Sequence, residues 1–212
     1  MLTALVDYDS GNLHSAQKAF ERMARERGEG TIVVTSEPDV VAKADRIVLP
    51  GDGAFPACKR HLFDHTGLFE AIEEAVTNRA RPFMGICIGM QMMATRGLEY
   101  EETAGFDWIG GEVDLIRPSD PTLKVPHMGW NDLVVEQAHP VLEGIETGDH
   151  AYFVHSYHVK VTDPAHRLAY VDYGEDVTAI IARDNMIGCQ FHPEKSQRAG
   201  LRIISNFLGW AP

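Results

Sequence analysis

The first half of the chain alternates short apolar runs with longer amphipathic stretches. The apolar runs cover residues 2–8, 31–36, 46–51 and 82–87. Between them, residues 15–28 and 67–80 have the apolar spacing of helices that bury one face. Strands that alternate with helices of this size favour a mainly parallel sheet covered on both faces.

The character of the sequence changes after Gly105. From there, short apolar or alternating segments are joined by Gly, Pro, Asn and Asp turns, which is typical of short antiparallel strands. Residues 196–210 are amphipathic and predict a closing helix. No repeat or linker interrupts the chain. We therefore expect an α/β fold with a mixed, mainly parallel central sheet flanked by helices, an antiparallel C-terminal half, and a single domain over residues 1–212.

Charge and cysteine content argue against several classes of protein. The chain carries 19 Lys and Arg against 31 Asp and Glu, a formal net charge of -12, whereas nucleic-acid binding depends on basic contacts. No uncharged apolar stretch is long enough to span a bilayer, and the N-terminal residues do not have the pattern of a signal peptide. Cys58, Cys87 and Cys189 are too few for a disulfide scaffold. We expect a cytoplasmic protein that binds neither nucleic acid nor membrane.

The segment GICIGMQ, residues 85–91, places a cysteine between two glycines. The pattern G-x-C-x-G is the cysteine analogue of the nucleophile elbow, in which a strand-to-helix turn presents the nucleophile at the end of a sheet. Residues 82–87 are a plausible strand and residues 90–97 a plausible helix, whose N-terminus would favour a thiolate at Cys87. The alternative interpretation is a buried, inert cysteine in a glycine-rich turn.

A cysteine nucleophile needs a base, and His192 in GCQFHPEK is the best candidate among ten histidines. Glu194 follows two residues later, so an extended backbone projects both side chains to the same face. A carboxylate in that place could orient the imidazole. Taken alone, the segment would be read as a surface turn.

Acyl chemistry also needs donors for a developing oxyanion. The N–H of Ile88 directly follows the nucleophile, and the loop LPGDGAF offers Gly51, Asp52 and Gly53 after a strand. A plain strand-to-loop turn is the alternative. The loop lacks the Lys-Ser/Thr ending of a P-loop. No histidine spacing indicates a metal site, so we expect neither a metal nor a cofactor.

GICIGMQ, FHPEK and LPGDGAF together resemble the class I glutamine amidotransferases, whose glutaminase domains have a flavodoxin-like fold and use a Cys-His-Glu triad to release ammonia from glutamine. Further blocks are similar to the glutaminase subunits of imidazole glycerol-phosphate synthases. They are DYDSGNLHSAQKAF from Asp7, VPHMGWN from Val125, YFVHSYH from Tyr152 and FHPEKSQ from Phe191. The blocks extend from Asp7 to Gln197.

The resemblance implies a role for each matching position. Cys87 would be the nucleophile, His192 the proton carrier and Glu194 its orienting carboxylate. The oxyanion positions are Gly51, Asp52, Gly53 and Ile88. The positions that bind the substrate glutamine are Gln91, His155, Ser156 and Tyr157. The positions at the partner contact are Asn12, Met128, Trp130, Tyr152 and Lys195.

The resemblance also implies a partner, a separate (β/α)8-barrel cyclase subunit that uses the ammonia to make imidazole glycerol phosphate and aminoimidazole carboxamide ribotide in histidine biosynthesis. Because a glutaminase acting alone wastes glutamine, we expect the oxyanion segment around Asp52 to be misaligned without the partner. The family often has Val where this chain has Asp52, and we expect that carboxylate to point away from the site.

Three other functions stay open at this point. The glutaminase subunit of another synthase, serving pyridoxal phosphate or anthranilate formation, would keep the triad and change the partner-facing blocks. A cysteine peptidase of similar fold would not need Gln91. A non-catalytic regulatory subunit would not need an intact Cys87, His192 and Glu194.

Overall fold

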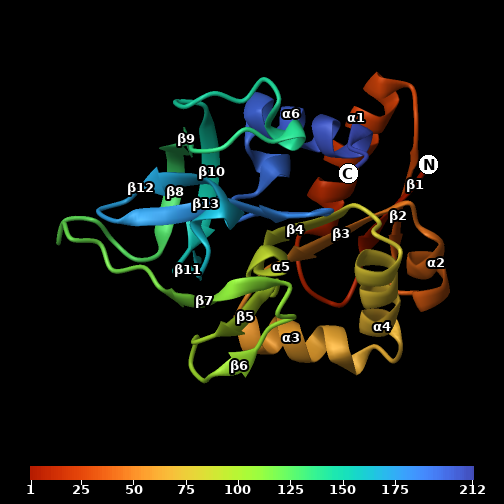
Figure 1. Cartoon of the computed structure of the whole chain (residues 1–212), viewed down its shortest axis with the longest axis horizontal. Helices are drawn as coiled ribbons and strands as arrows, with labels where there is room; N and C mark the ends of the chain where they lie inside the picture. Colours follow the sequence, from red (N-terminus) through yellow and green to blue (C-terminus); the bar gives the residue numbers. More distant parts are fainter.

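The computed structural model describes residues 1–212, and its centre is an eight-stranded sheet (Figure 1). The strand order is β2-β1-β3-β4-β14-β13-β12-β9. Five neighbouring strands are parallel: β2 (Thr31–Thr35), β1 (Leu2–Val6), β3 (Arg46–Gly51), β4 (Phe83–Cys87) and β14 (Met186–Cys189). The other three are antiparallel: β13 (Asp176–Arg183), β12 (Arg167–Asp172) and β9 (Val134–Val135). The sheet is therefore mixed, as expected.

Helices cover both faces of the parallel part. The helix α1 (Leu13–Arg27) packs against α6 (Gln197–Gly209), and Figure 1 shows both on one side of the sheet. The other side carries α3 (Phe55–Asp64) and α4 (Leu68–Glu73). Helix α4 continues as a π-helical turn and contacts α2 (Pro38–Lys43). Strands β3 and β4 are buried along their whole length, which explains why their sequences are continuous apolar runs.

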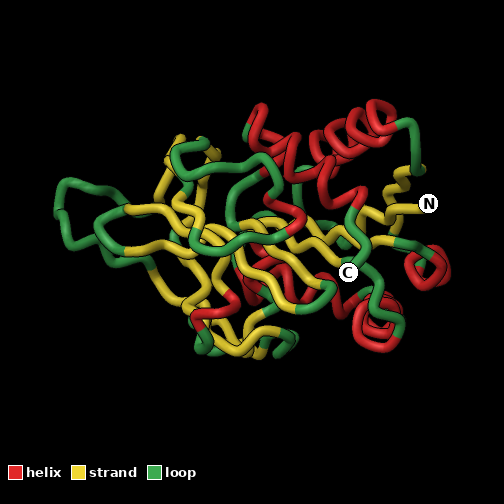
Figure 2. The backbone as a smooth tube through the Cα atoms, turned by 45° about the horizontal axis from the view of Figure 1, so that its top comes forward, coloured by secondary structure: helices red, strands yellow, loops and turns green.

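Two smaller sheets occupy the strand-rich half of the molecule, opposite the helix-rich half (Figure 2). One is a two-stranded antiparallel ribbon of β8 (His127–Asp132) and β10 (His150–His155). The other has the order β11-β7-β5-β6, with β11 (Tyr157–Val161), β7 (Ile109–Leu115), β5 (Ala94–Gly97) and β6 (Thr103–Ala104). Short 3-10 turns cover Pro140–Leu142, Pro164–His166 and Pro193–Lys195.

The prediction of a helix over residues 90–97 is wrong. Only Ile88–Gln91 is helical, as the short helix α5, and Ala94 begins a strand. The carbonyls of Met92 and Met93 accept from Phe106 and Trp108 instead of from residues one turn further on. Pairing with a distant segment thus overrides the local preference.

The apolar segment after residue 150 is two strands, not one. Strand β10 ends at His155 and pairs with β8, whereas β11 begins at Tyr157 and pairs with β7. His155, at the end of β10, and His158, in β11, therefore belong to different sheets.

One hydrophobic core includes side chains from both the parallel and the antiparallel halves. Cys87 belongs to it, at the end of the central strand β4. Each helix is too short or too polar to cross a membrane.

Candidate active site

Cys87 lies at a sharp turn between β4 and α5, as the glycine pattern predicted. Its backbone has φ 54° and ψ -111°, a conformation that non-glycine residues adopt only when the surrounding fold enforces it. The positive φ therefore belongs to the cysteine itself. The flanking glycines serve close approach, because a Cβ on Gly89 would collide with the Leu49 carbonyl and one on Gly85 with Gly89.

His192 and Glu194 form a buried pair beside this turn. Nδ1 of His192 lies 2.9 Å from Oε1 of Glu194, and the two side chains are only 5% and 3% exposed. Nε2 of His192 is buried and has no hydrogen-bond partner of good geometry in the protein. Burial alone lowers the pKa of His192, but the neighbouring Cys87 sulfur and the Glu194 carboxylate raise it by more, so the net pKa lies above the usual 6.5.

Ser196 holds the backbone of His192 in position. Its hydroxyl donates to the His192 carbonyl over 2.7 Å and accepts from the N–H of Tyr152 over 3.0 Å. The N–H of His192 in turn donates to the Tyr152 carbonyl over 3.2 Å. The backbone of His192 is therefore bonded to strand β10, both directly and through Ser196.

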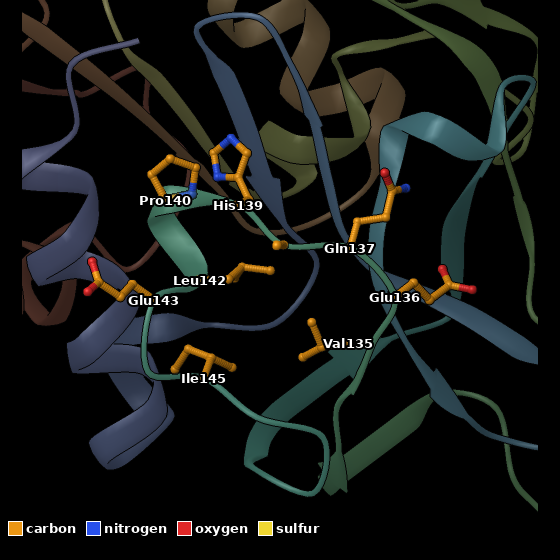
Figure 3. A pocket seen from close by; sticks show the side chains of 9 residues that line it. Val135, Glu136, Gln137, His139, Pro140, Leu142, Glu143 and Ile145 are labelled. Carbon is orange, nitrogen blue, oxygen red and sulfur yellow. The ribbon is translucent and has the colours of Figure 1, made fainter.

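A cavity of about 190 Å3 opens beside Cys87. It is lined by Asp52, Gly53, Cys87, Ile88, Gln91, Glu99, Pro126, Val154, His155, Ser156 and Tyr157. The structure thus brings together all the expected oxyanion and substrate positions except Gly51, which is buried against Tyr8 and Ile88 just behind. A larger cavity of about 680 Å3 lies elsewhere, between residues 135 and 145, and contains none of these residues (Figure 3).

Ser10 holds the segment that the sequence predicts to stabilise the oxyanion. The N–H of Asp52 donates to the Ser10 hydroxyl over 3.3 Å, and this hydroxyl donates to the Asp52 carbonyl over 2.8 Å. The Asp52 N–H is therefore engaged away from the cavity. Asp52 is exposed to solvent and also lines the cavity, so the direction of its carboxylate stays a prediction.

His155 uses both ring nitrogens within the protein. Its Nδ1 donates to the Tyr157 carbonyl over 2.8 Å, and its Nε2 accepts from Nδ1 of His127 over 3.2 Å. Nε2 of His127 accepts from the Asn131 amide over 3.3 Å. Burial lowers the pKa of His155 to about 3 and that of His127 to about 4. Both rings are neutral, and His155 forms a wall of the cavity with no free donor.

Three residues of the site escaped the sequence analysis, namely Glu99, Ser196 and Gln190. Glu99 is 9% exposed, lines the cavity and accepts from the N–H of Phe55 over 2.7 Å. Nothing local separates it from its exposed neighbours Glu101 and Glu102. Gln190 did carry a signal, because it has the same strand parity as His192 and Glu194.

Met128, Trp130 and Tyr152 lie on one face of the β8–β10 ribbon. Trp130 is opposite Tyr152 and Met128 is opposite Val154, with the rings of Trp130 and Tyr152 5.8 Å apart in an edge-to-face arrangement. Met128 is 63% and Trp130 49% exposed. Val154 also lines the cavity, so this apolar face reaches the site.

Asn12 and Lys195 stand apart from that ribbon face. The Asn12 side chain accepts from the N–H of Ser15 and caps α1. Lys195 is half-buried in the turn that carries Glu194. Nothing in these contacts tests a role at an interface.

The chain is similar to known proteins over its whole length. An "Imidazole glycerol phosphate synthase subunit HisH" of Cereibacter sphaeroides is 73% identical over 212 residues, and one of Ruegeria pomeroyi is 65% identical, both at 100% of each chain. A solved structure described as a glutamine amidotransferase has a TM-score of 0.72 at 17% identity and covers 98% of this chain and 99% of its own. A solved structure of a glutamine amidotransferase from Thermotoga maritima has a TM-score of 0.63 at 15% identity, and the match covers 99% of this chain and 83% of the other.

The two structural neighbours share the fold expected from the sequence. The family model for "Glutamine amidotransferase class-I" matches residues 6–209, which include the elbow, the histidine pair and the cavity. The chain belongs to the class-I glutamine amidotransferase family.

Proposed function

We propose that this chain is the glutaminase subunit of an imidazole glycerol-phosphate synthase, acting in histidine biosynthesis. The observation that carries the proposal is the strained elbow of Cys87 beside the buried His192–Glu194 pair. Full-length relatives at 73% and 65% identity whose names state that synthase support the choice of this member of the family.

The chemistry follows from the arrangement of these three side chains. The Cys87 thiolate attacks the side-chain amide carbon of glutamine, and the resulting tetrahedral intermediate expels ammonia. Because Nδ1 of His192 is bonded to Glu194, Nε2 is the atom that gives the proton to the departing nitrogen. The product is a glutamyl thioester on Cys87.

Hydrolysis of the thioester uses the same groups in reverse. Nε2 of His192 takes a proton from water, the hydroxide attacks the thioester carbon, and the carbon–sulfur bond breaks to give glutamate and the thiolate. The raised pKa of His192 keeps the imidazolium form available at the start of each cycle. Glu194 stabilises that imidazolium and keeps its orientation.

Substrate binding uses polar residues that line the cavity. Oε1 of Gln91 is buried and accepts no hydrogen bond, so it offers an acceptor to the substrate amide or ammonium group. The Glu99 carboxylate suits the α-ammonium group of glutamine. His155, Ser156 and Tyr157 also line the cavity.

The oxyanion segment is incomplete in this conformation. Ile88 offers an N–H at the start of α5, whereas the Asp52 N–H is bonded to Ser10. Rotation of the peptide between Gly51 and Asp52 would aim this N–H at the site, and Gly53 would contribute freedom to the loop. We therefore infer that the isolated chain rests in a low-activity state.

The partner that we propose is a barrel-type cyclase subunit that receives ammonia. The exposed apolar face of Met128, Trp130 and Tyr152 leads to the cavity through Val154, so a partner bound there would cover the site and trap the ammonia. Asn12 and Lys195 are proposed at the margin of this contact. The shared hydrophobic core supports a single domain over residues 1–212, and we propose that it acts in the cytoplasm without a cofactor.

Reconstitution with the cyclase subunit tests the proposal. Wild-type chain should support synthesis of imidazole glycerol phosphate from glutamine, and Cys87→Ala should support it only from added ammonia. Synthesis with the partner subunit of another synthase would instead identify that synthase. Cleavage of protein substrates would identify a peptidase, and loss of ammonia-dependent synthesis in an assembled Cys87→Ala complex would contradict the assigned roles.

A further inference from the structure

We propose that Gln190 acts directly on the nucleophile: its side-chain amide donates a hydrogen bond to the Cys87 sulfur, stabilises the thiolate and fixes its position for attack. The proposal rests on the proposed function for the reaction that the thiolate performs. The contact itself is a property of the folded chain and can be tested without substrate or partner.

The central sheet brings Gln190 beside Cys87. Strands β14 and β4 are parallel, with Gly188 opposite Gly85 and Cys189 opposite Ile86, so the next residues on the two strands are neighbours. Nε2 of Gln190 lies 3.7 Å from the Cys87 sulfur, within the range of a hydrogen bond to sulfur. The Gln190 side chain is fully buried, which removes competition from solvent.

The orientation of the Gln190 amide follows from its neighbours. The Tyr157 carbonyl can only accept, so the atom of Gln91 that lies 3.1 Å from it must be the nitrogen. The same nitrogen lies 3.1 Å from the amide of Gln190, which must present its oxygen there. The remaining atom, the nitrogen of Gln190, then faces sulfur. The reversed amide would set two donors against each other.

A donor in this place favours the charged form of the nucleophile. A hydrogen bond to an anion is stronger than one to a neutral group, so the amide stabilises thiolate more than thiol. The other titratable groups around the sulfur are His192, Tyr8 and Cys58. His192 changes charge during the reaction, whereas Gln190 remains a neutral donor throughout.

The chain of amides also connects the nucleophile to the wall of the cavity. It runs from the Tyr157 carbonyl through Gln91 and Gln190 to Cys87. Tyr157 and Gln91 both line the cavity. The hydrogen-bonded chain therefore sets the position of the Cys87 sulfur relative to the two residues that a substrate in the cavity contacts.

The test replaces Gln190 by methionine, which has a similar shape and no donor. The full-length chain is alkylated with iodoacetamide over a range of pH, and the modified Cys87 peptide is quantified by mass spectrometry. We expect the pH midpoint of Cys87 alkylation to rise by about one unit, about a tenfold loss of thiolate at a fixed pH below the midpoint. An unchanged midpoint in folded Gln190→Met would overturn the proposal.

Gln137→Met is the matched control. The Gln137 amide donates to the carbonyls of Pro164, Ala165 and Arg167 and does not touch the site. Gln137→Met should lower the melting temperature and leave the pH midpoint of Cys87 alkylation unchanged. A purely structural role for Gln190 would give the same result in Gln190→Met.

A second measurement serves if Gln190→Met does not fold. In 15N-labelled wild-type chain, the side-chain amide resonance of Gln190 should shift with pH at the alkylation midpoint, and this shift should vanish in Cys87→Ala. If the Gln190 amide resonance does not shift at the pH midpoint of Cys87 alkylation, the proposal is contradicted. Neither readout uses glutamine or the cyclase, so a failure of the proposed glutaminase function would be seen separately, in the reconstituted assay.

Discussion

The Ser10 hydroxyl bonds both backbone groups of Asp52, donating to its carbonyl over 2.8 Å and accepting from its N–H over 3.3 Å. It also lies 3.1 Å from the sulfur of Cys58, which is buried. This arrangement engages the Asp52 N–H, which the proposed mechanism requires for the oxyanion. In the proposed mechanism, Ser10, a residue far away in the sequence, therefore sets the resting state of the site.

Ser10→Ala should free this N–H. We expect glutamine hydrolysis by the isolated chain to rise several-fold, because the lost bond stabilised the inactive peptide orientation by about 1 kcal/mol. Glutamate release without the cyclase is the measurement, with Ser15→Ala, at the start of α1, as the control. A fall in hydrolysis would mean that Ser10 supports the active conformation instead.

Glu194→Gln should lower glutaminase activity less than His192→Ala. The amide can still accept from Nδ1 of His192, so orientation is kept, but the charge that raises the His192 pKa is lost. We expect kcat to fall roughly tenfold to a hundredfold, and the alkaline limb of the pH profile to move to lower pH. A profile with an unmoved alkaline limb would contradict the role given to the carboxylate.

The buried histidines should make the fold sensitive to mild acid. Burial lowers the folded-state pKa of His155 to about 3, and those of His127 and His158 to about 4. Below about pH 6.5 the unfolded chain binds protons that the folded chain does not, so stability falls as pH falls, until the folded-state pKa values are reached.

Each of these histidines contributes a slope of about 1.4 kcal/mol per pH unit where only its unfolded form is protonated. Urea unfolding between pH 6.5 and 5 measures the summed slope of the unfolding free energy against pH. His127→Gln should reduce this slope by the contribution of one histidine. His61→Gln changes an exposed ring and should leave the slope unchanged. Equal slopes in wild type and His127→Gln would refute this account.

Trp130→Ala should weaken binding of the cyclase. A half-exposed tryptophan at the centre of an interface is typically worth about 2 kcal/mol, which corresponds to about a 30-fold increase in Kd. Titration calorimetry with the purified subunits measures this. Tyr100→Ala, at an exposed tyrosine away from the ribbon, is the control. If the two variants bind alike, the partner lies elsewhere.

Much of the site was already present in local sequence patterns. The glycines around Cys87 predicted the elbow. The contact of His192 with Glu194 was also expected, but the 3-10 turn at Pro193–Lys195 makes it, not the extended backbone that the two-residue spacing predicted. The alternation of apolar runs and amphipathic stretches predicted the parallel part of the sheet. These features depend on periodicity and turn chemistry, which a few neighbouring residues specify.

Other features depended on contacts between distant segments. The strand at Ala94 replaced a predicted helix because it pairs with β7, and Glu99 became buried while its neighbours stayed exposed. Gln190 contacts Cys87, which is 103 residues away in the sequence, and Ser10 contacts Asp52, which is 42 residues away. The order of strands in the sheet brings these residues together. The sequence by itself therefore determined the reactive groups and their local turns. The tertiary structure alone decided which polar groups surround them, because burial and hydrogen bonding between remote segments exist only once the sheet has formed.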